Sequence, residues 1–338
     1  MGKGSFTIND IAQKTGVSKS TVSRVLSNDI HVSPETKEKV LACAKEMNFQ
    51  PNYFAKGLKT RKSRTIAFLV PNIEIMIYPA IIQAMEMETL KRGYNILLCD
   101  VQENKEIARE YVRNLKSRNV DGFIFSTAYS DSSLNEEIKD AEKAGIPCVN
   151  LLRTDSSDTV SVHLDNTKGS EIGVNFLIEK GKRRIAYIQG QEELQLYRDR
   201  FEGYKRALGK HGIPYDESLV WCGFRDGEFC ASSEVKNRLS SGINVDAIFC
   251  SSDNLATSAM HALYEIGYKI PDDISLVGYD NVPISQLLIP RLTSIGQPFK
   301  EMGRKVIDVL IDMIEGKEID EKESLVFDPF LIVGDTVK

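Results

Sequence analysis

Apolar side chains recur at intervals of three and four residues through the first fifty positions of the chain, which is the spacing of helices that bury one face. Residues typical of helix starts stand before three such stretches. The predicted helices and their caps are residues 8–15 after Thr7 with Asp10, 19–27 after Ser18, and 35–48 after Ser33 and Pro34. Their apolar positions predict one small shared core, made of Ile8, Ile11, Ala12, Val17, Val22, Val25, Leu26, Val40, Leu41 and Ala44.

From residue 65 onward, short apolar runs alternate with amphipathic helical stretches. The runs that we interpret as strands are residues 65–71, 95–100, 122–127, 147–152, 184–190, 247–252 and 275–280. Strand alternating with helix predicts parallel sheets that are covered on both faces. So many strands exceed what one open sheet usually holds, and residues 160–173 are typical of a passage between two halves. We therefore expect two similar α/β lobes that bind a ligand at the carboxyl ends of their strands.

Charge separates the front of the chain from the rest. The formal net charge is −5, but residues 1–64 hold twelve Lys or Arg and five Asp or Glu, which gives +7 and leaves −12 for the remainder. A basic segment of this kind favours a polyanionic partner such as nucleic acid.

The cysteines and the first residues indicate the compartment. Six cysteines lie far apart along the chain without a C-x-x-C pair, so we expect small buried hydrophobes in a reducing cytosol. The start MGKGSFTIND has no apolar leader, and no apolar run approaches the roughly 20 residues of a membrane helix. We expect a soluble cytoplasmic protein that is not exported.

Residues 10–26, DIAQKTGVSKSTVSRVL, have the spacing of a helix-turn-helix, which lays its second helix in the major groove of DNA. Gly16 allows the turn, and three outward side chains, Lys19, Ser20 and Arg24, are positioned to read base edges. Candidates for phosphate contacts are Thr7, Ser18, Thr21, Ser23, Asn28, Ser33 and Thr36. The alternative interpretation is that the charged residues form a solvated face and the hydroxyls only cap helices.

These stretches carry a family resemblance. TINDIAQKTGVSKSTVSRVLSN, HVSPETKEKVLACAKEMNFQPNYFAKGL and a late DISLVGYDN resemble the LacI/GalR family of bacterial repressors over nearly the whole chain. The resemblance implies an all-α helix-turn-helix DNA-binding headpiece, a hinge helix, and an α/β core of two doubly wound parallel-sheet lobes like a type I periplasmic binding protein. It also implies a homodimer on a palindromic DNA operator. The expected boundaries are 1–50 for the headpiece, 51–64 for hinge and linker, and 65–338 for the core, with a first lobe of about 65–163 plus 296–322 and a second of about 164–295 plus 323–338.

The hinge gives a role to an isolated leucine. Leu58 stands among basic and small residues without an apolar partner at helical spacing downstream. In the family, the leucine at this position wedges between two base pairs in the minor groove, an insertion that unstacks one step. Asn52, Ala55 and Lys56 would accompany it. The alternative is a linker leucine that packs under the core. A helix this short is unstable alone in water, so we expect it to fold only when paired on DNA.

The resemblance also implies residues that bind a small-molecule effector. Arg200, in LYRDRFEGYKRAL, matches the family's ligand-clamping arginine, and Asp280, at the end of SLVGYDN, matches its ligand-binding aspartate. Other matched positions are Ile77, Tyr78, Phe224, Ser252, Gln297 and Phe299, with Ile75, Arg153, Asp155, Arg198 and Asp253 ranked lower. For Arg198 a surface ion pair with Asp199 or Glu202 is favoured, and for Asp253 a role in fixing its loop.

No constellation supports catalysis or a metal. The four histidines are scattered, and there is no P-loop, nucleophile elbow or dinucleotide fingerprint. We therefore expect a transcriptional regulator, not an enzyme, without a cofactor but with an effector that is a sugar or sugar phosphate. The alternatives are a purine or nucleoside effector, a partner-protein co-repressor, and, from another class, the solute-binding protein of a transporter, which the headpiece and the missing leader disfavour.

Overall fold

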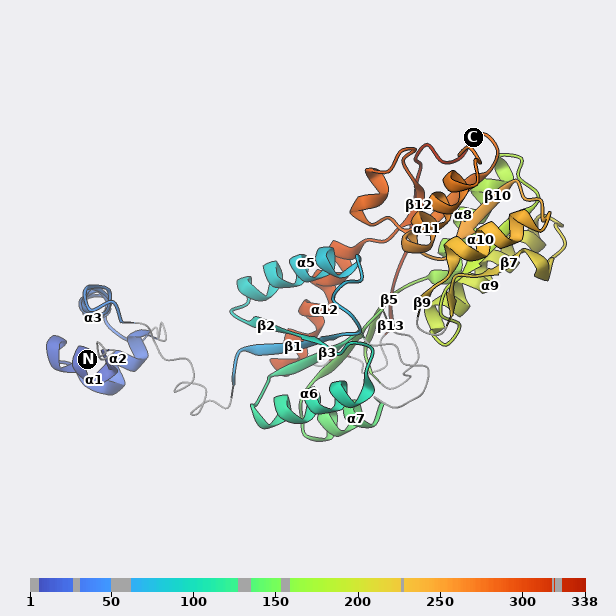
Figure 1. Cartoon of the computed structure of the whole chain (residues 1–338). Coiled ribbons are helices and arrows are strands. Elements are labelled where there is room, and N and C mark those ends of the chain that lie inside the picture. Colours follow the sequence, from blue (N-terminus) through green and yellow to red (C-terminus); the bar gives the residue numbers. More distant parts are fainter. Residues whose placement is uncertain are drawn as a thin grey trace. The chain divides into compact units, whose positions relative to one another are not determined.

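The computed structural model describes residues 6–26, 31–49, 62–126, 135–152, 159–225, 228–317, 319 and 324–338. The chain divides into two compact units, Met1–Ser63 and Arg64–Lys338, coloured from blue to red along the sequence in Figure 1.

The first unit holds the helices α1 (Ile8–Thr15), α2 (Lys19–Leu26) and α3 (Pro34–Glu46). Gly16 ends α1 with φ 68°, a left-handed conformation that glycine adopts without strain. The Asp10 carboxylate accepts hydrogen bonds from the Thr7 N–H and hydroxyl at 2.7 and 2.8 Å. The Ser18 hydroxyl accepts one from the Thr21 N–H at 3.1 Å. The chain thus begins its first two described helices where the sequence pattern predicts.

Side chains from all three helices enclose one small core. Its buried members are Ile11, Ala12, Val22, Val25, Val40, Cys43 and Ala44. Leu41 was predicted to belong to this core, and that prediction is wrong, because 44% of the residue is exposed. Val40 takes the inward position, and the next residue of a helix points about 100° away from it.

The second unit contains two six-stranded sheets. In the first, all neighbours are parallel, in the order β13 (Ser324–Phe327), β5 (Ser161–Leu164), β4 (Cys148–Leu151), β3 (Gly122–Phe125), β1 (Thr65–Val70) and β2 (Asn95–Asp100). In the second, only β14 is antiparallel, and the order is β14 (Phe330–Ile332), β12 (Thr293–Gly296), β11 (Ser275–Asp280), β10 (Ala247–Cys250), β6 (Ile185–Gln189) and β7 (Val220–Cys222).

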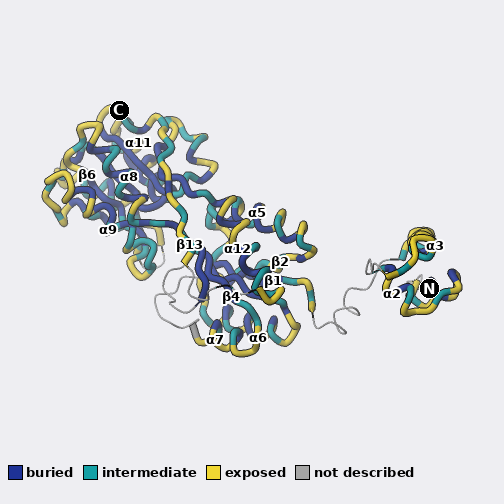
Figure 2. Tube along the Cα trace, turned by 180° about the vertical axis from the view of Figure 1, so that it is seen from behind, coloured by how far each residue is buried: buried dark blue, intermediate teal, exposed yellow. Residues whose placement is uncertain are grey.

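Helices cover both faces of each sheet, which buries the central strands (dark blue in Figure 2). On the first sheet, α5 (Tyr78–Lys91) and α12 (Phe299–Ile314) pack on one face, and α6 (Lys105–Ser117) and α7 (Asn135–Lys143) on the other. On the second, α10 (Ala231–Ser240) and α11 (Asp253–Glu265) face α8 (Asn166–Glu179) and α9 (Gln195–Lys210) across the sheet. Short 3-10 turns are η2 (Glu217–Leu219) and η3 (Pro283–Gln286), and β8 (Phe224–Arg225) pairs with β9 (Glu228–Phe229).

One predicted lobe boundary is wrong. Residues 323–338 were expected in the second lobe, but β13 pairs with β5, so residues 324–327 belong to the first sheet and β14 to the second. The alternating exposed and half-buried positions of β13 carry little apolar signal in the sequence. The chain therefore passes between the two sheets three times: from β5 to β6 through α8, from β12 to β13 through α12, and from β13 to β14.

The helices α8 and α9 approach each other closely at a glycine. A Cβ added at Gly203 would lie 2.2 Å from the carbonyl oxygen of Thr167 and 2.8 Å from the Ser170 side chain. Because Gly203 stands one turn after Arg200 on α9, this contact also fixes how far that arginine reaches toward the end of the sheet.

We predict that Gly203→Ala lowers the free energy of unfolding by about 2 kcal/mol or more, because a rigid backbone oxygen occupies the space of the new methyl group. The matched control is Gly209→Ala on the same helix, where nothing lies within 4 Å of the added Cβ. That change should be neutral or stabilise by up to about 1 kcal/mol, since alanine has the higher helix propensity. Urea unfolding followed by the fluorescence of Trp221, the single tryptophan and fully buried, measures both. Equal effects of the two substitutions would contradict the prediction.

Candidate functional site

The second helix of the first unit presents a polar face to solvent. Lys19, Ser20, Ser23 and Arg24 are exposed, while Val22 on the opposite face has no exposed surface. Thr21 is half-buried, and the Ser18 hydroxyl lies 2.7 Å from that of Ser20 and 2.8 Å from that of Thr21. The side chains proposed to read bases therefore stand together on the outer surface of α2.

Three of the proposed phosphate contacts also hold helix ends. The hydroxyls of Thr7 and Ser18 are bonded as described above, and the Ser33 hydroxyl accepts from the Thr36 N–H at 3.4 Å. A hydroxyl has one proton, so Ser18, which accepts from the Thr21 N–H, can also donate to a phosphate, whereas the Thr7 and Ser33 hydroxyls would have to release Asp10 and Thr36 first. Asn28, Asn52, Ala55, Lys56 and Leu58 lie outside the described residues.

In the second unit, a buried arginine stands at the carboxyl end of the second sheet. The Arg200 guanidinium, 5% exposed, donates from Nη2 to Asp280 Oδ1 at 3.0 Å and from Nη1 to the Ser251 carbonyl oxygen at 2.6 Å. Its Nε donates to Asn166 Oδ1 at 2.9 Å, and its Cζ lies 3.7 Å from the centre of the Tyr279 ring. Residues from α8, α9, β11 and the end of β10 thus converge on one guanidinium.

Asp280 ends β11 with a φ of 108°, an uncommon conformation for a residue with a Cβ. Its Oδ1 also accepts from Gln297 Nε2 at 2.6 Å. Burial raises the pKa of Asp280, while the Arg200 charge and the Gln297 hydrogen bond act to lower it. Within the described part of the chain, no group donates to Asp280 Oδ2. This carboxylate oxygen is therefore the acceptor that a ligand could use.

Asp253 holds the backbone around this pair. Its Oδ1 accepts from the Ser294 hydroxyl at 2.6 Å, and its Oδ2 accepts from the Ser285 hydroxyl at 2.5 Å and the Val282 N–H at 2.9 Å. Burial raises the pKa of Asp253 to about 7, with a further contribution from Asp280. Asp253 fixes the loop after β11, the role that the sequence favours for it.

Two other predicted residues stand near this framework without an assigned ligand contact. Ser252 caps α11, with its hydroxyl accepting from the Leu255 N–H at 3.3 Å. Phe224 lies on the β8–β9 hairpin, half-buried, with its ring edge-on to Phe229 at 5.4 Å.

The aromatic residues predicted for the first lobe are packed inside it. Tyr78 is 3% exposed, and its hydroxyl lies 3.0 Å from that of Ser126. Phe299, 8% exposed, belongs to the same core, against which Ile75 and Ile77 pack partly buried. These contacts give Tyr78 and Phe299 a packing role.

Arg198 does not make the ion pair that the sequence favoured. It is exposed and donates to the Gln195 side chain and to the carbonyl oxygens of Glu192 and Glu193, because it follows a turn whose carbonyls lie within reach. Glu202 pairs instead with Lys205 and Arg206. Arg153 and Asp155 lie outside the described residues.

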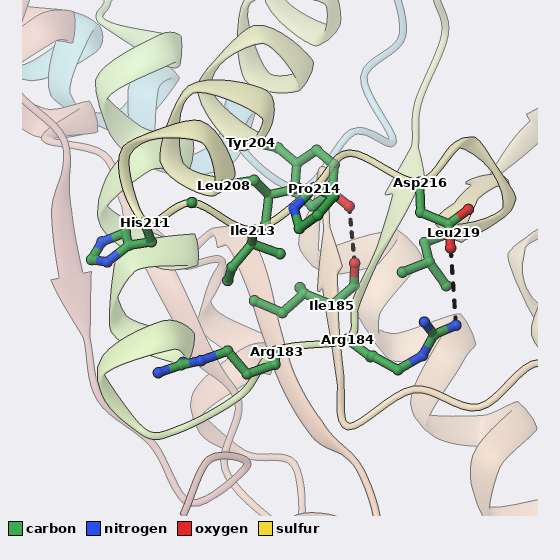
Figure 3. Close-up of a pocket in the computed structure, with 11 residues that line it drawn as sticks. Arg183, Arg184, Ile185, Tyr204, Leu208, His211, Ile213, Pro214, Asp216 and Leu219 are labelled. Atoms are coloured by element: carbon green, nitrogen blue, oxygen red, sulfur yellow. Dashed lines mark hydrogen bonds and ion pairs between the residues drawn. The ribbon is translucent and has the colours of Figure 1, made fainter.

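A cavity of about 450 Å³ lies at the opposite end of the second sheet (Figure 3). It is lined at the start of β6 by Arg184 and Ile185, and by Leu219 just before β7. Two contacts within the lining involve its polar groups: the Tyr204 hydroxyl donates to the Ile185 carbonyl oxygen at 2.9 Å, and Arg184 forms an ion pair with Asp216 at 4.0 Å. Parallel sheets bind ligands at the other end of their strands, so this cavity is not part of the Arg200 site.

Within the described ranges, no three His, Cys, Asp or Glu side chains are grouped so as to hold a metal ion. The helices in the same ranges include none long and apolar enough to cross a membrane.

Two family models match separate parts of this chain, and known proteins match nearly its whole length. Residues 7–52 match the family model described as bacterial regulatory proteins, lacI family, and residues 174–337 match a periplasmic binding protein-like domain. The HTH-type transcriptional regulator RegA of Clostridium saccharobutylicum is 35% identical, with 93% of this chain and 94% of that protein covered. The chain belongs to the lacI family. It is a DNA-binding transcriptional regulator, not merely a protein of similar fold.

Other lacI-family members are similar over equal lengths. The ribose operon repressor of Halalkalibacterium halodurans is 34% identical over 93% of this chain and 92% of its own, and the transcriptional repressor PurR of Vibrio campbellii is 32% identical over 98% of both. Among solved structures, the lac repressor dimer bound to operator and the anti-inducer ONPF has a TM-score of 0.87 at 27% identity, covering 98% of this chain and 99% of that one. The regulator CelR in complex with cellobiose has a TM-score of 0.74 at 29% identity, with coverage of 98% and 99%.

Sequence reasoning missed two residues of the Arg200 cluster. Asn166 lies at the start of α8, inside the segment interpreted only as a passage between halves, and Tyr279 was treated as an ordinary strand residue. Both residues could have been found from their place at the carboxyl end of a strand, where parallel sheets bind ligands. Tyr279 precedes Asp280 at the end of β11, and Asn166 follows the last residues of β5.

We predict that Arg200→Met and Asp280→Asn each lower the free energy of unfolding by about 3 kcal/mol, because each leaves a buried charged or polar partner unpaired. In the double variant, the decrease in the free energy of unfolding should be smaller than the sum of the two single decreases, by at least about 1 kcal/mol. Urea unfolding followed by Trp221 fluorescence measures the cycle. Arg198→Met, on the exposed side of the same helix, serves as the control and should stay within about 0.5 kcal/mol of the original. Additive losses at Arg200 and Asp280 would show that the two side chains are not coupled.

Proposed function

We propose that this regulator represses transcription as a homodimer on a palindromic operator, and that a small sugar or sugar phosphate controls its affinity for DNA. The observation that carries the effector part is the buried Arg200–Asp280 pair, in which Asp280 Oδ2 accepts no hydrogen bond from the described residues. The similarity to the lac repressor dimer bound to operator supports the DNA part. On this proposal the protein is cytoplasmic and has no catalytic activity of its own.

The headpiece, residues 1–50, would place α2 in the major groove. Lys19, Ser20 and Arg24 would contact base edges, because they share the exposed face of that helix. Phosphate contacts would come from Thr7, Ser18, Thr21, Ser23, Asn28, Ser33 and Thr36. In the hinge, Leu58 would insert between base pairs at the operator centre, with Asn52, Ala55 and Lys56 beside it.

The effector would lie against Arg200 and Asp280. A carboxylate oxygen accepts a sugar hydroxyl, and guanidinium N–H groups donate to hydroxyl or phosphate oxygens. Relatives named for ribose and solved with cellobiose support a carbohydrate. Gln297, Ser252 and Phe224 stand as neighbouring contacts, and Ile75, Ile77, Tyr78, Phe299, Arg153, Asp155, Arg198 and Asp253 as weaker ones.

A purine is the second candidate effector. The similarity to PurR repressors over 98% of the chain favours it, and so does the half-buried aromatic ring of Phe224, on which a flat base would stack. The same carboxylate would accept purine N–H groups.

Control of DNA binding requires two states with different effector affinity. We infer that effector binding changes how the two lobes are held, and that this changes the separation of the paired hinges and the insertion of Leu58. The direction of the response depends on which state the ligand binds more tightly.

We predict that exchanging Lys19 and Ser20 for each other changes which operator the protein prefers. The starting operator is selected from a random DNA pool by the unaltered protein, and binding to it and to all single-base variants is measured by fluorescence anisotropy at fixed salt. Each lost base contact should cost about 1–3 kcal/mol at particular positions. Lys39→Ala, exposed on α3, serves as control and should leave the order of preference unchanged. Uniform weakening by the exchange across all sequences would assign Lys19 and Ser20 to phosphate contacts.

We predict that Asp280→Asn shifts the effector response to higher effector concentrations while operator binding persists. Operator affinity is measured with ribose, cellobiose, a sugar phosphate and hypoxanthine, and the molecule that shifts it for the unaltered protein is retained. Loss of a hydrogen bond to a charged group should weaken its binding by roughly tenfold to a hundredfold. Asp272→Asn, whose carboxylate pairs with Lys338 on the surface, is the control. An unchanged response in Asp280→Asn, with Trp221 fluorescence showing a folded core, would exclude this carboxylate from the site.

A further inference from the structure

Two of the six cysteines meet in the second lobe, contrary to the expectation that all are separate buried hydrophobes. The sulfur atoms of Cys222 and Cys230 lie 3.5 Å apart, and both residues are half-buried. Cys99, Cys148 and Cys250 have no exposed surface, and Cys43 is 7% exposed in the headpiece. The two cysteines are eight positions apart in the sequence, a spacing that does not by itself indicate a contact.

The backbone holds the two cysteines in place. Cys222 ends β7, the edge strand of the second sheet, and Cys230 stands just before α10. The Cys230 N–H donates to the Gly223 carbonyl oxygen at 3.0 Å, and the Gly223 N–H donates to the Gln189 carbonyl oxygen at 2.9 Å. A Cβ on Gly223 would lie 2.5 Å from that oxygen of Gln189. The loop from 222 to 230 is therefore already closed by hydrogen bonds at its base.

We propose that Cys222 and Cys230 are a thiol modification site that forms a reversible intrachain disulfide when the protein meets a peroxide. A disulfide bond is about 2.05 Å long, and the sulfurs need to approach by only about 1.5 Å from their present separation. Side-chain rotation supplies this distance while the hydrogen-bonded backbone stays where it is.

The surroundings select Cys222 as the thiol that reacts first. Arg225 lies close to it, since the pKa of Arg225 is raised chiefly by the charge of Cys222 and a hydrogen bond to it, and then by Cys230. In thiol oxidation the thiolate is the nucleophile. Burial, together with the neighbouring Cys222, raises the pKa of Cys230 to about 11, so Cys230 is the resolving thiol.

The chemistry balances with hydrogen peroxide as the two-electron oxidant. The Cys222 thiolate attacks one peroxide oxygen, the O–O bond breaks, and the departing hydroxide takes up a proton to become water, which leaves a sulfenic acid on Cys222. The Cys230 sulfur then attacks the Cys222 sulfur, the S–O bond breaks, and a second water leaves with the Cys230 proton. Two thiols and one peroxide give one disulfide and two waters.

The disulfide would change the hairpin that follows it. In the reduced protein the Cys222 thiol donates to the Phe224 carbonyl oxygen at 3.2 Å, and the Cys230 thiol donates to the Cys222 carbonyl oxygen at 3.3 Å. Oxidation removes both donors at the base of the hairpin that carries Phe224 and the 60% exposed Phe229. Resting on the proposed effector role of Phe224, we infer that oxidation weakens the effector response.

The test treats the full-length reduced protein with one equivalent of hydrogen peroxide, alkylates it under denaturing conditions and maps peptides by mass spectrometry. A 222–230 disulfide peptide is expected in most molecules, with the other four cysteines alkylated, and dithiothreitol should reverse it. Cys230→Ser should retain a sulfenic acid on Cys222 that dimedone traps, whereas Cys222→Ser should leave Cys230 largely unreacted. Arg225→Gln should slow disulfide formation several-fold in the otherwise unaltered protein.

Free thiols at both positions after peroxide, or a disulfide that involves any other cysteine, would overturn the proposal whatever the effector proves to be. A second measurement compares the effector response of oxidised and reduced protein, with the Cys222→Ser, Cys230→Ser double variant as the control that peroxide should not affect. A 222–230 disulfide with an unchanged response would refute the link to Phe224. A response absent even from reduced protein would count against the proposed effector function, not against the disulfide.

Discussion

The candidate effector site depends on one buried cation. Arg200 is almost completely enclosed, and a guanidinium cannot lose its charge there, so the surrounding chain must supply acceptors. The groups that surround it come from three separate segments: the start of α8, the end of β10, and the end of β11, which supplies both the Asp280 carboxylate and the Tyr279 ring. This requirement fixes the ends of the central strands relative to α8 and α9. Gly203 lets these two helices come close enough for Arg200 to reach its acceptors.

A second buried carboxylate, that of Asp253, holds the loop that follows Asp280. Asp253 is buried below Asp280 and satisfies the Val282 backbone N–H and the hydroxyls of Ser285 and Ser294. The two aspartates act on each other, since Asp280 contributes to raising the pKa of Asp253. One carboxylate thus shapes the loop, and the other keeps an oxygen for a ligand. Acceptor positions fixed in this way reduce the cost of ordering the site when a ligand binds.

Much of this architecture was predictable from the sequence because periodicity and capping are local. The three headpiece helices and the alternation of strand and helix follow from patterns within about fifteen residues, whereas Arg200 and Asp280 were singled out by the family resemblance of their segments. Leu41 was misplaced locally, by one position in the phase of its helix, whereas two failures were non-local, since β13 joined the first sheet and Cys222 met Cys230 across a hairpin. Asn166 was missed for the same reason, since only the folded chain brings the end of β5 beside α9. The hinge around Leu58 lies outside the described residues and stays a prediction.

The hydrogen bond from Gln297 to Asp280 has a consequence for signalling. Gln297 follows β12 of the second sheet and stands two residues before α12, which packs on the first. Asp280, the proposed ligand-binding aspartate, is therefore hydrogen-bonded to one of the segments that connect the two sheets. On the proposed function, a ligand that takes up Oδ1 would displace the Gln297 amide, whereas a ligand that bonds only to Oδ2 would leave that hydrogen bond to the connecting segment in place.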